Sequence, residues 1–482
     1  MTFHTPFTAI QARGLAATLL AVLGLASCSS GAMPVIEGPT AELRELTGAR
    51  TRVVWVQGDG TDAFAMGTNF VLMGLDTDDG RGERPLVDQR GSFAKPLFLP
   101  GGDRLVYSTS PAAGGPEVFI LNWDGSGLRR LATGFALSVW RDPADGREWL
   151  YVGTDHDEEF DFANVWRFPV DDPVRRELVW NQSKVGRDTF QVSADGRVAG
   201  GVFPWPHVGV GDLPNGTFRR VADGCWTALA NPGPPVLWYM DGAHRNLTLV
   251  DLETDRRWSL PINQAPGFRN PEVYHPRWTN HPRFLAITGP YDQGGANQVR
   301  TGGTQTEVHV GRFSTDYTRV EAWARATHND GGDLYPDVWI DASRSPHPLR
   351  VDGAVGPAVD VATSGATPAS GARSAGRLIV EARLLVPGTI PPPQDILPYR
   401  HALVVNDYEV VRVVEGEYDA RSIQVAQWAI RDTRVLAGAR KTAGSVHRLT
   451  VELFSAHPEL EGERLIAGPE SSSLPLYYEV ES

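Results

Sequence analysis

The sequence is poor in cysteine, in positive charge and in the short motifs that mark catalytic sites. Only Cys28 and Cys225 occur among 482 residues, which excludes a fold built on several disulfides. The 45 lysines and arginines are outnumbered by 58 aspartates and glutamates, and the net charge of −13 argues against nucleic acid as a partner. No G-x-S-x-G, H-E-x-x-H, P-loop or G-x-G-x-x-G motif is present, so no catalytic residue is assigned.

One long apolar run stands out, close to the N-terminus. Arg13 precedes the segment GLAATLLAVLGLAS, which has the length of a signal peptide's hydrophobic region and is too short to span a bilayer. The run ends in Leu25-Ala26-Ser27-Cys28, which resembles the lipobox of bacterial lipoproteins. That resemblance implies a signal peptide over residues 1–27 and a lipid on Cys28, which would anchor the protein in the membrane. A plain secretory signal is the alternative.

The residues after the lipobox predict where the anchor is retained. Residues 28–49 begin with a short polar tether, and no aspartate stands at the second position after Cys28. By the sorting rule of bacterial lipoproteins, this favours the outer membrane, with the protein facing the periplasm. The other cysteine, Cys225, is expected to be a small buried hydrophobic residue.

Turn-forming and aromatic residues are abundant, with 51 glycines, 36 prolines and 14 tryptophans. Many turns joined by short aromatic strands predict an all-β protein. Two motifs recur together at roughly the 40–45-residue period of propeller blades. The clearest copy is FLPGGDRLVY from Phe98, followed by the hairpin EVFILNWDGSGLRRL from Glu117. Fainter copies begin at Trp140, Val192, Leu229 and Trp278.

These paired motifs resemble the PD40 repeats of TolB-like propellers. The resemblance covers residues 50–342 and implies a β-propeller of six blades, with seven as the alternative. Radial repetition of short sheets leaves only short, protected edges, so such a chain needs no disulfides. The segment Arg52–Val56 is expected either to open the first blade or to close the ring.

A change in composition separates the propeller from a second β domain. Residues 343–376 are rich in Ser, Ala, Gly and Pro, which predicts a flexible linker. In residues 377–482, alternation and β-branched content predict an OB-like barrel, with an immunoglobulin-like sandwich as the alternative. The expected strands cover residues 377–386, 402–414, 422–430, 447–454 and 474–480.

Four histidines are candidates for a metal site. His275 and His281 each precede a proline, which favours an extended backbone that could turn both imidazoles toward the central channel. With His207 and His244 they could bind a divalent metal, in a site resembling that of the propeller-fold oligogalacturonate lyases. The alternative is that His275 and His281 lock the blades through hydrogen bonds to the backbone.

Two further groups of residues are candidate ligand-binding sites. The acidic stretch beginning with Asp155, His156 and Asp157 could bind Ca²⁺, or it could be a solvated loop. Aromatic residues could line a mouth that binds sugar, or they could fill the space between blades. The members of this second group are Trp205, Trp226, Trp238, Trp278 and Trp339.

The sequence therefore predicts a lipid-anchored propeller of the bacterial envelope that binds or scaffolds a protein or polysaccharide and is not an enzyme. No cofactor follows from the sequence except the divalent metal of the histidine hypothesis. The alternative function is a metal-dependent polysaccharide lyase or hydrolase that uses the four histidines.

Overall fold

The computed structural model describes most of the chain after its N-terminal segment. The described residues are 39–110, 114–157, 160–240, 244–269, 271–291, 302–349, 355–357, 377–396, 401–431, 434–457, 460, 463–466 and 475–480. The expected signal peptide and Cys28 lie outside them. No helix among the described residues combines the length and the apolar character needed to cross a membrane.

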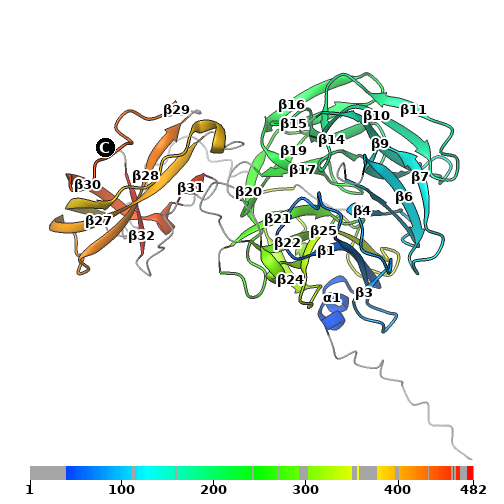
Figure 1. The fold of residues 1–482 in the computed structure, drawn as a ribbon, viewed down its shortest axis with the longest axis horizontal. Helices are drawn as coiled ribbons and strands as arrows, with labels where there is room; N and C mark the ends of the chain where they lie inside the picture. The colour runs from blue at the N-terminus through cyan, green and yellow to red at the C-terminus, as the bar shows by residue number, and fades with distance from the viewer. Residues whose placement is uncertain are drawn as a thin grey trace, which may run out of the picture. The chain divides into compact units, whose positions relative to one another are not determined.

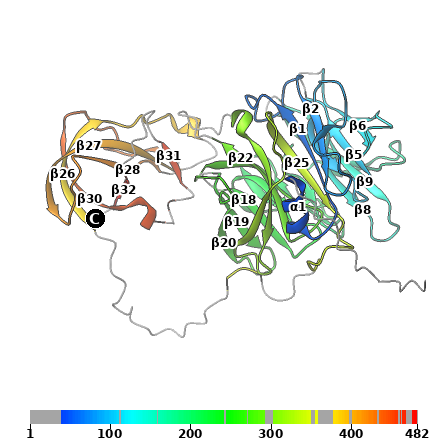
Figure 2. The same ribbon diagram turned by 90° about the horizontal axis from the view of Figure 1, so that it is seen from below.

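The described residues form six β-sheets arranged as propeller blades and a seventh sheet that closes into a barrel (Figures 1 and 2). The all-β prediction with six blades is confirmed, and the seven-blade alternative is wrong. Within each blade the neighbouring strands are antiparallel, and the innermost strands of adjacent blades contact one another around the centre.

The strands of the first three blades follow one another from the centre of the ring outward. Blade 1 comprises β25 (Gly332–Ile340), β1 (Thr51–Gly58), β2 (Val71–Asp76) and β3 (Arg84–Pro85). Blade 2 comprises β4 (Ala94–Phe98), β5 (Arg104–Ser108), β6 (Glu117–Asn122) and β7 (Arg129–Thr133). Blade 3 comprises β8 (Phe135–Arg141), β9 (Glu148–His156), β10 (Asp161–Pro169) and β11 (Glu177–Trp180), with β12 (Val185–Gly186) beside β10.

The remaining three blades have the same order from the centre outward. Blade 4 comprises β13 (Gln191–Val192), β14 (Val198–Val202), β15 (His207–Asp212) and β16 (Thr217–Asp223). Blade 5 comprises β17 (Cys225–Leu229), β18 (Val236–Met240), β19 (Asn246–Asp251) and β20 (Arg257–Pro261). Blade 6 comprises β21 (Glu272–Trp278), β22 (Phe284–Tyr291), β23 (Glu307–Phe313) and β24 (Val320–Arg325), with the short 3₁₀ helix η2 (Gly303–Gln305) before β23.

Blade 1 joins the two ends of the propeller. β25 comes from the C-terminal end of the repeat region and pairs antiparallel with β1, from Thr51 opposite Ile340 to Gly58 opposite Gly332. The two strands lie side by side in Figure 2. The segment Arg52–Val56 thus belongs to the first blade and also takes part in closing the ring, so both expected roles are met by one strand.

The predicted hairpin turns form between the strands of blade 2. Gly102 between β4 and β5 has φ +75°, and Gly125 between β6 and β7 has φ +86°. Residues other than glycine rarely adopt this left-handed backbone conformation. A Cβ atom on Gly102 would lie 2.2 Å from the indole of Trp339. The turn therefore needs glycine for its backbone and for the space beside blade 1.

The short helix α1 (Pro39–Thr47) packs on the outside of the propeller. Proline suits the first turn of a helix, and Gly48 ends it with φ +64° and a hydrogen bond from its N–H to the carbonyl of Arg44 at 2.9 Å. Leu43 and Leu46 are buried in an apolar cluster shared with blades 1 and 6. Their burial fixes the start of the described chain to the ring.

The C-terminal domain is a closed barrel, so the OB-like prediction is confirmed at the level of a five-stranded barrel and the sandwich alternative is wrong. Its strands are β26 (Leu378–Val386), β27 (Ala402–Glu415), β28 (Ser422–Arg431), β30 (Val446–Leu453) and β32 (Leu476–Glu479). Around the barrel the strands follow the order β26, β27, β28, β32, β30 and back to β26. In this order β28 and β32, the third and fifth of these strands along the chain, pair in parallel. The short elements of this domain are η3 (Pro393–Ile396), β29 (Arg434–Val435), η4 (Phe454–Ala456) and β31 (Arg464–Ile466).

Candidate functional site

The innermost strands of four blades share a backbone irregularity. The φ angles of Lys95, Trp226, His275 and Tyr335 lie between +44° and +51°, a region that is uncommon for bulky side chains and often found at functional sites. Each lies at a break in strand register, as in a β-bulge. A bulge re-aims a side chain, and all four residues line one small cavity between the blades.

A second, wider cavity lies next to this central cavity, at the end of the ring where the innermost strands finish. We call the two cavities together the channel. The wider cavity has a volume of about 260 Å³, compared with about 30 Å³ for the central cavity. Its walls come from the last residues of the innermost strands and the turns after them, and they include Trp140, Ala194, Trp278 and Trp339. Arg277 lines both cavities. We call the wider cavity the channel mouth.

The loop of residues 59–69, between β1 and β2, closes the other end of the channel. The Nε2 of His275 donates to the carbonyl of Ala63 at 3.0 Å, and the hydroxyl of Ser110 donates to the carbonyl of Met66 at 2.6 Å. The space between this loop and the ring, which Phe64, Phe160 and other side chains line, has no room for a water molecule. Among the described residues, the channel is therefore closed at this end, and we call it blind.

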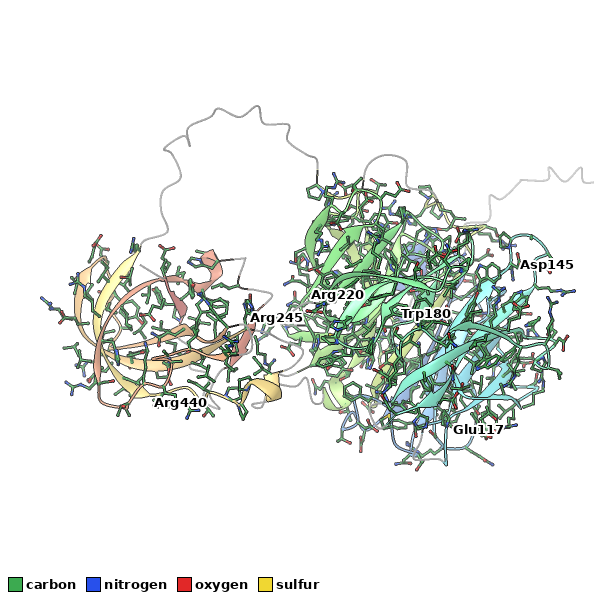
Figure 3. All side chains as sticks on the ribbon, turned by 90° about the horizontal axis from the view of Figure 1, so that it is seen from above. Glu117, Asp145, Trp180, Arg220, Arg245 and Arg440 are labelled. Carbon is green, nitrogen blue, oxygen red and sulfur yellow. The ribbon has the colours of Figure 1, made fainter. Side chains whose placement is uncertain are left out.

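Three cationic side chains and two carboxylates lie around the channel. Arg187 forms an ion pair with Asp188 at 3.1 Å, and Arg277 forms one with Asp337 at 2.9 Å. Lys95 is 3% exposed, and its ammonium donates to two backbone carbonyls, of Leu137 at 3.0 Å and Arg187 at 2.7 Å. Burial, reinforced by the positive charge of Arg277, lowers the pKa of Lys95 to about 7. The charged side chains around the channel thus lie inside the ring, whereas Glu117, Asp145 and Arg220 lie on the outer surface (Figure 3).

The carboxylate of Asp337 is held on both sides. One oxygen accepts from the Nε of Arg277, and the other accepts from the backbone N–H of Phe98 at 2.6 Å. Burial nevertheless raises the pKa of Asp337 above its ordinary value. The two Nη atoms of Arg277 have no hydrogen-bond or ion-pair partner among the described residues. They are the free donors of the channel.

The structure separates the four candidate histidines. Of the four, only His275 lines the channel, where its Nε2 donates to Ala63 and its Nδ1 accepts from the hydroxyl of Thr288 at 2.7 Å. His281 lies in the turn after β21, where its Nδ1 accepts from the backbone of Arg283 and its Nε2 donates to the carbonyl of His347 at 3.2 Å. Both histidines thus hold the backbone, as in the blade-locking alternative.

His207 and His244 lie away from this pair. His207 is half exposed on β15, with its Nδ1 3.1 Å from Asp223. His244 is buried, and its Nε2 lies 3.4 Å from the sulfur of Cys225, which is half-buried rather than buried. Among the described residues, no group of three or more His, Cys, Asp or Glu side chains is arranged to hold a metal ion. The arrangement gives the four-histidine hypothesis no support.

The candidate tryptophans divide into two sets. Trp226 lines the central cavity, and Trp278 and Trp339 line the mouth, so the structure brings these three to the same channel. Trp238 stacks on Trp278 with ring centroids 4.2 Å apart, as the packing alternative predicts. Trp205 is 39% exposed in the turn between β14 and β15 and lines neither cavity.

Two carboxylates of the acidic loop form hydrogen bonds and an ion pair with neighbouring residues of the protein. Asp157 forms an ion pair with Lys184 at 2.6 Å and accepts from the backbone N–H of Asp161. Asp155 accepts from the side chain of Asn164, also at 2.6 Å, and the ring of His156 packs against Phe160. The carboxylates of Asp155 and Asp157 therefore already have protein partners.

Sequence reasoning missed the charged residues of the channel. Lys95, Arg187, Arg277 and Asp337 were not candidates, although one pattern could have revealed their location. Three of the four left-handed residues precede a proline: Lys95, His275 and Tyr335. That recurrence on innermost strands, rather than the histidines alone, marks the channel.

Comparisons with known proteins bear on the fold alone. The sequence matches no protein-family model and no curated protein. TolB from Acinetobacter baumannii is 13% identical over 62% of this chain and 70% of that one, with a TM-score of 0.42. The putative TolB from Agrobacterium tumefaciens is 12% identical over 44% of this chain and 89% of that one, at 0.32. A chain of a nidogen/laminin complex is 11% identical over 60% and 98%, at 0.39. The domain of residues 51–340 is a six-bladed β-propeller by its own strand topology, and its similarity to the TolB structures is one of fold alone.

Proposed function

We propose that this protein is a non-catalytic binding module of the bacterial cell envelope, and that the channel mouth receives part of a partner protein. The observation that carries the proposal is the blind channel, which opens into a cavity of about 260 Å³ with free donors on Arg277. Concave sites with a few oriented polar groups are typical of binding sites. A rigid ring with the site among its turns suits such a role.

A protein partner fits the mouth better than a polysaccharide does. Sugars bind to exposed aromatic faces, but each of three indoles at the mouth already has a protein group against one face. Trp278 stacks on Trp238, Arg167 lies over the ring of Trp140, and Arg52 lies over the ring of Trp339. The metal-dependent lyase or hydrolase has no comparable support, because the histidines it needs are dispersed.

The experiment is photo-crosslinking in intact cells from a single position in the mouth. Ala194 is exposed and lines the mouth, whereas Ala144 is an equally exposed alanine in the turn after β8 that lines neither cavity. A photoreactive amino acid at position 194 is expected to capture a discrete protein adduct, and the same residue at 144 is not. Equal adducts from both positions, or none from 194, would contradict the proposal.

The envelope location is part of the same proposal and has its own test. Its support is the lipobox at Leu25–Cys28. Cells fed a palmitate analogue are expected to label the wild-type protein and to leave Cys28→Ala unlabelled and released from the membrane fraction. Cys225→Ala serves as the matched control and is expected to label normally. Labelling of Cys28→Ala would refute the anchor.

A further inference from the structure

The channel mouth is shaped for the end of a chain. Because the loop of residues 59–69 closes the far end, a ligand cannot thread through the ring and must stop inside it. The mouth is somewhat smaller than the roughly 300–1,000 Å³ of most small-molecule pockets. Its volume of about 260 Å³ therefore suits a few terminal groups rather than a long segment.

The charges around the channel leave one positive charge uncompensated when Lys95 is protonated. Arg187 and Arg277 are each paired with an aspartate, while the hydrogen-bond partners of Lys95 among the described residues are two neutral carbonyls. An ammonium has three N–H donors, and two are used. The electrostatic complement is a single anionic group placed near Lys95 and Arg277.

Arg277 has the geometry to bind that group. Its Nε is fixed to Asp337, which orients the guanidinium, and its two Nη atoms are free at the junction of the two cavities. A fixed guanidinium fork can bind a carboxylate through two parallel charge-assisted hydrogen bonds, which are stronger and more specific in geometry than neutral ones.

We propose that the channel mouth binds the C-terminal carboxylate of a partner polypeptide, held by the Nη atoms of Arg277 with Lys95 behind them. This inference rests on the proposed function, because it specifies which part of the partner enters the mouth. The protein groups that already occupy one face of each of these indoles favour a peptide end over an acidic sugar. The acidic sugar is treated as an outcome of the test.

The test uses the mature protein and three small probes in ligand-observed NMR titrations. The probes are N-acetyl-Ala-Ala with a free carboxylate, the same dipeptide as its C-terminal amide, and galacturonic acid. We expect the free acid to bind at least ten-fold more tightly than either of the other two. Equal binding of the acid and the amide, no binding of the acid, or preferred binding of galacturonic acid would each overturn the inference.

Two variants and one control locate the effect. Arg277→Gln and Arg277→Lys are expected to weaken binding of the free acid at least ten-fold, because glutamine lacks the charge and lysine lacks the fork. Arg84→Gln removes an arginine of similar burial that is ion-paired with Asp79 and lies over Trp123 outside the channel, and it should bind normally. Unchanged binding by both Arg277 variants would contradict the assignment. The acid-to-amide comparison on the unaltered protein needs no variant to fold.

The two proposals can fail separately. If position 194 captures a partner in cells while the acid and amide bind equally, the binding function stands and the carboxylate assignment falls. If the free acid binds through Arg277 but no partner is captured at 194, the pocket chemistry stands and the proposed function falls.

Discussion

Lys95 shows how burial changes the chemistry of one residue. Its ammonium is fixed by two carbonyls inside the ring, and the charges facing it are Arg187, Asp188, Arg277 and Asp337. His275 and Tyr335 line the same cavity. Apart from the proline that follows Lys95, its sequence neighbours do not indicate this setting, because the charged groups that face it come from distant parts of the chain.

The buried lysine predicts a pH dependence of stability. In the unfolded chain it stays protonated up to about pH 10.5, but in the folded protein only up to about pH 7. Between these values the unfolded state binds more protons, so the Lys95 contribution makes stability rise with pH, by at most about 1.4 kcal/mol per pH unit. Urea unfolding at pH 7, 8 and 9 should show this rise in the wild type and a flatter profile in Lys95→Met.

A surface lysine provides the control for that experiment. Lys184 is half exposed and ion-paired with Asp157, so Lys184→Met should keep the wild-type slope between pH 7 and 9. A Lys95→Met profile parallel to the wild type would show that Lys95 does not titrate in this range.

His275 is one residue that ties the loop closing the channel to the ring. Replacing it with alanine removes the donor to Ala63 and the acceptor for Thr288, at a cost of about 1–3 kcal/mol in unfolding free energy. Limited proteolysis of His275→Ala should cut within residues 59–69 faster than in the wild type. His207→Ala, which removes a half-exposed histidine with one side-chain partner, should change neither quantity appreciably. Unaltered proteolysis of His275→Ala would mean that other contacts hold the loop.

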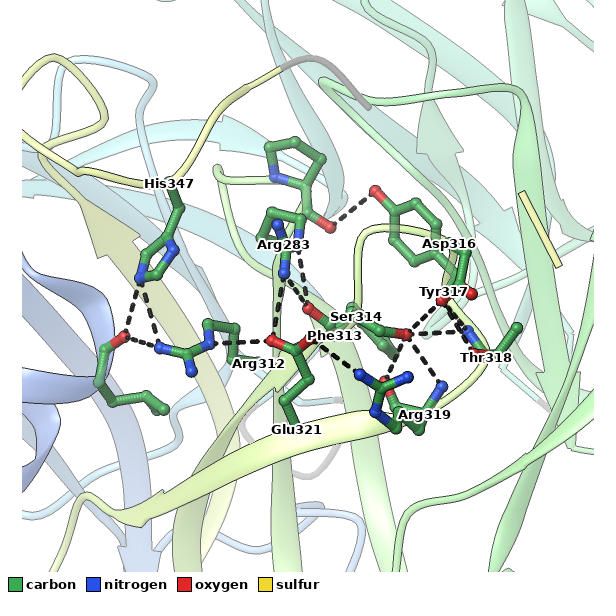
Figure 4. A network of polar contacts seen from close by, with 12 residues as sticks. Arg283, Arg312, Phe313, Ser314, Asp316, Tyr317, Thr318, Arg319, Glu321 and His347 are labelled. Carbon is green, nitrogen blue, oxygen red and sulfur yellow. Dashed lines mark hydrogen bonds and ion pairs between the residues drawn. The ribbon is translucent and has the colours of Figure 1, made fainter. Parts of the chain in front are cut away.

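At the scale of the element, blade 6 depends on one carboxylate of its outermost strand. The carboxylate of Glu321 on β24 forms ion pairs with the guanidinium groups of Arg283, Arg312 and Arg319, with N–O distances of 3.4–3.5 Å (Figure 4). Arg283 is buried, and it also donates to the carbonyl of Phe313 at 2.9 Å through its Nε. Burial lowers the pKa of Arg283, and the charge of Glu321 opposes that shift. The carboxylate thus compensates a cation that the blade has taken out of water.

Glu321→Gln is therefore expected to destabilise the protein by about 1–3 kcal/mol, because it leaves the buried Arg283 without an anionic partner. The matched control is Glu117→Gln, which breaks an exposed pair with Arg130 and should cost less than about 1 kcal/mol. Denaturant unfolding of both variants measures the difference. Equal losses would show that the network adds nothing beyond a surface pair.

Elements were predictable from sequence to the extent that local turns define them. The Gly-Asp and Asp-Gly turns predicted the hairpins of blade 2, and alternation located the five barrel strands to within two residues at every end. The positions of the candidate histidines were not predictable in this way. β21 ends at Trp278, so His275 lies within the strand near the closed end of the channel, and His281 lies in the turn beyond the other end. At about 3.3 Å per residue, strand geometry alone separates them.

At the scale of the whole molecule, ring closure rests on β25. A chain ending at Leu349 retains this strand, whereas one ending at Gly331 lacks it and leaves β1 without its inner partner. We expect the longer fragment to unfold cooperatively and elute as a monomer, and the shorter one to lose cooperativity and aggregate through the exposed strand. Circular dichroism melts and size-exclusion chromatography check both. Cooperative unfolding of the shorter fragment would show that the other five blades suffice.

The channel itself is a property of the whole molecule, which is why the sequence did not reveal it. Lys95, Trp226, His275 and Tyr335 come from four blades and meet only because the ring brings their innermost strands together. Periodicity along the chain identifies each blade. It does not say which side chain a bulge turns toward the axis.

The pairing of β1 with β25 also has a mechanical consequence. Thr51, where the chain enters the ring, is opposite Ile340, where it leaves. Tension applied through the two ends would therefore load the hydrogen bonds of this pair one after another, as in unzipping, instead of loading them all at once in shear. Blade 1 is then the place where a stretched propeller opens first, and the force needed to open it is set by single strand pairs rather than by the whole sheet.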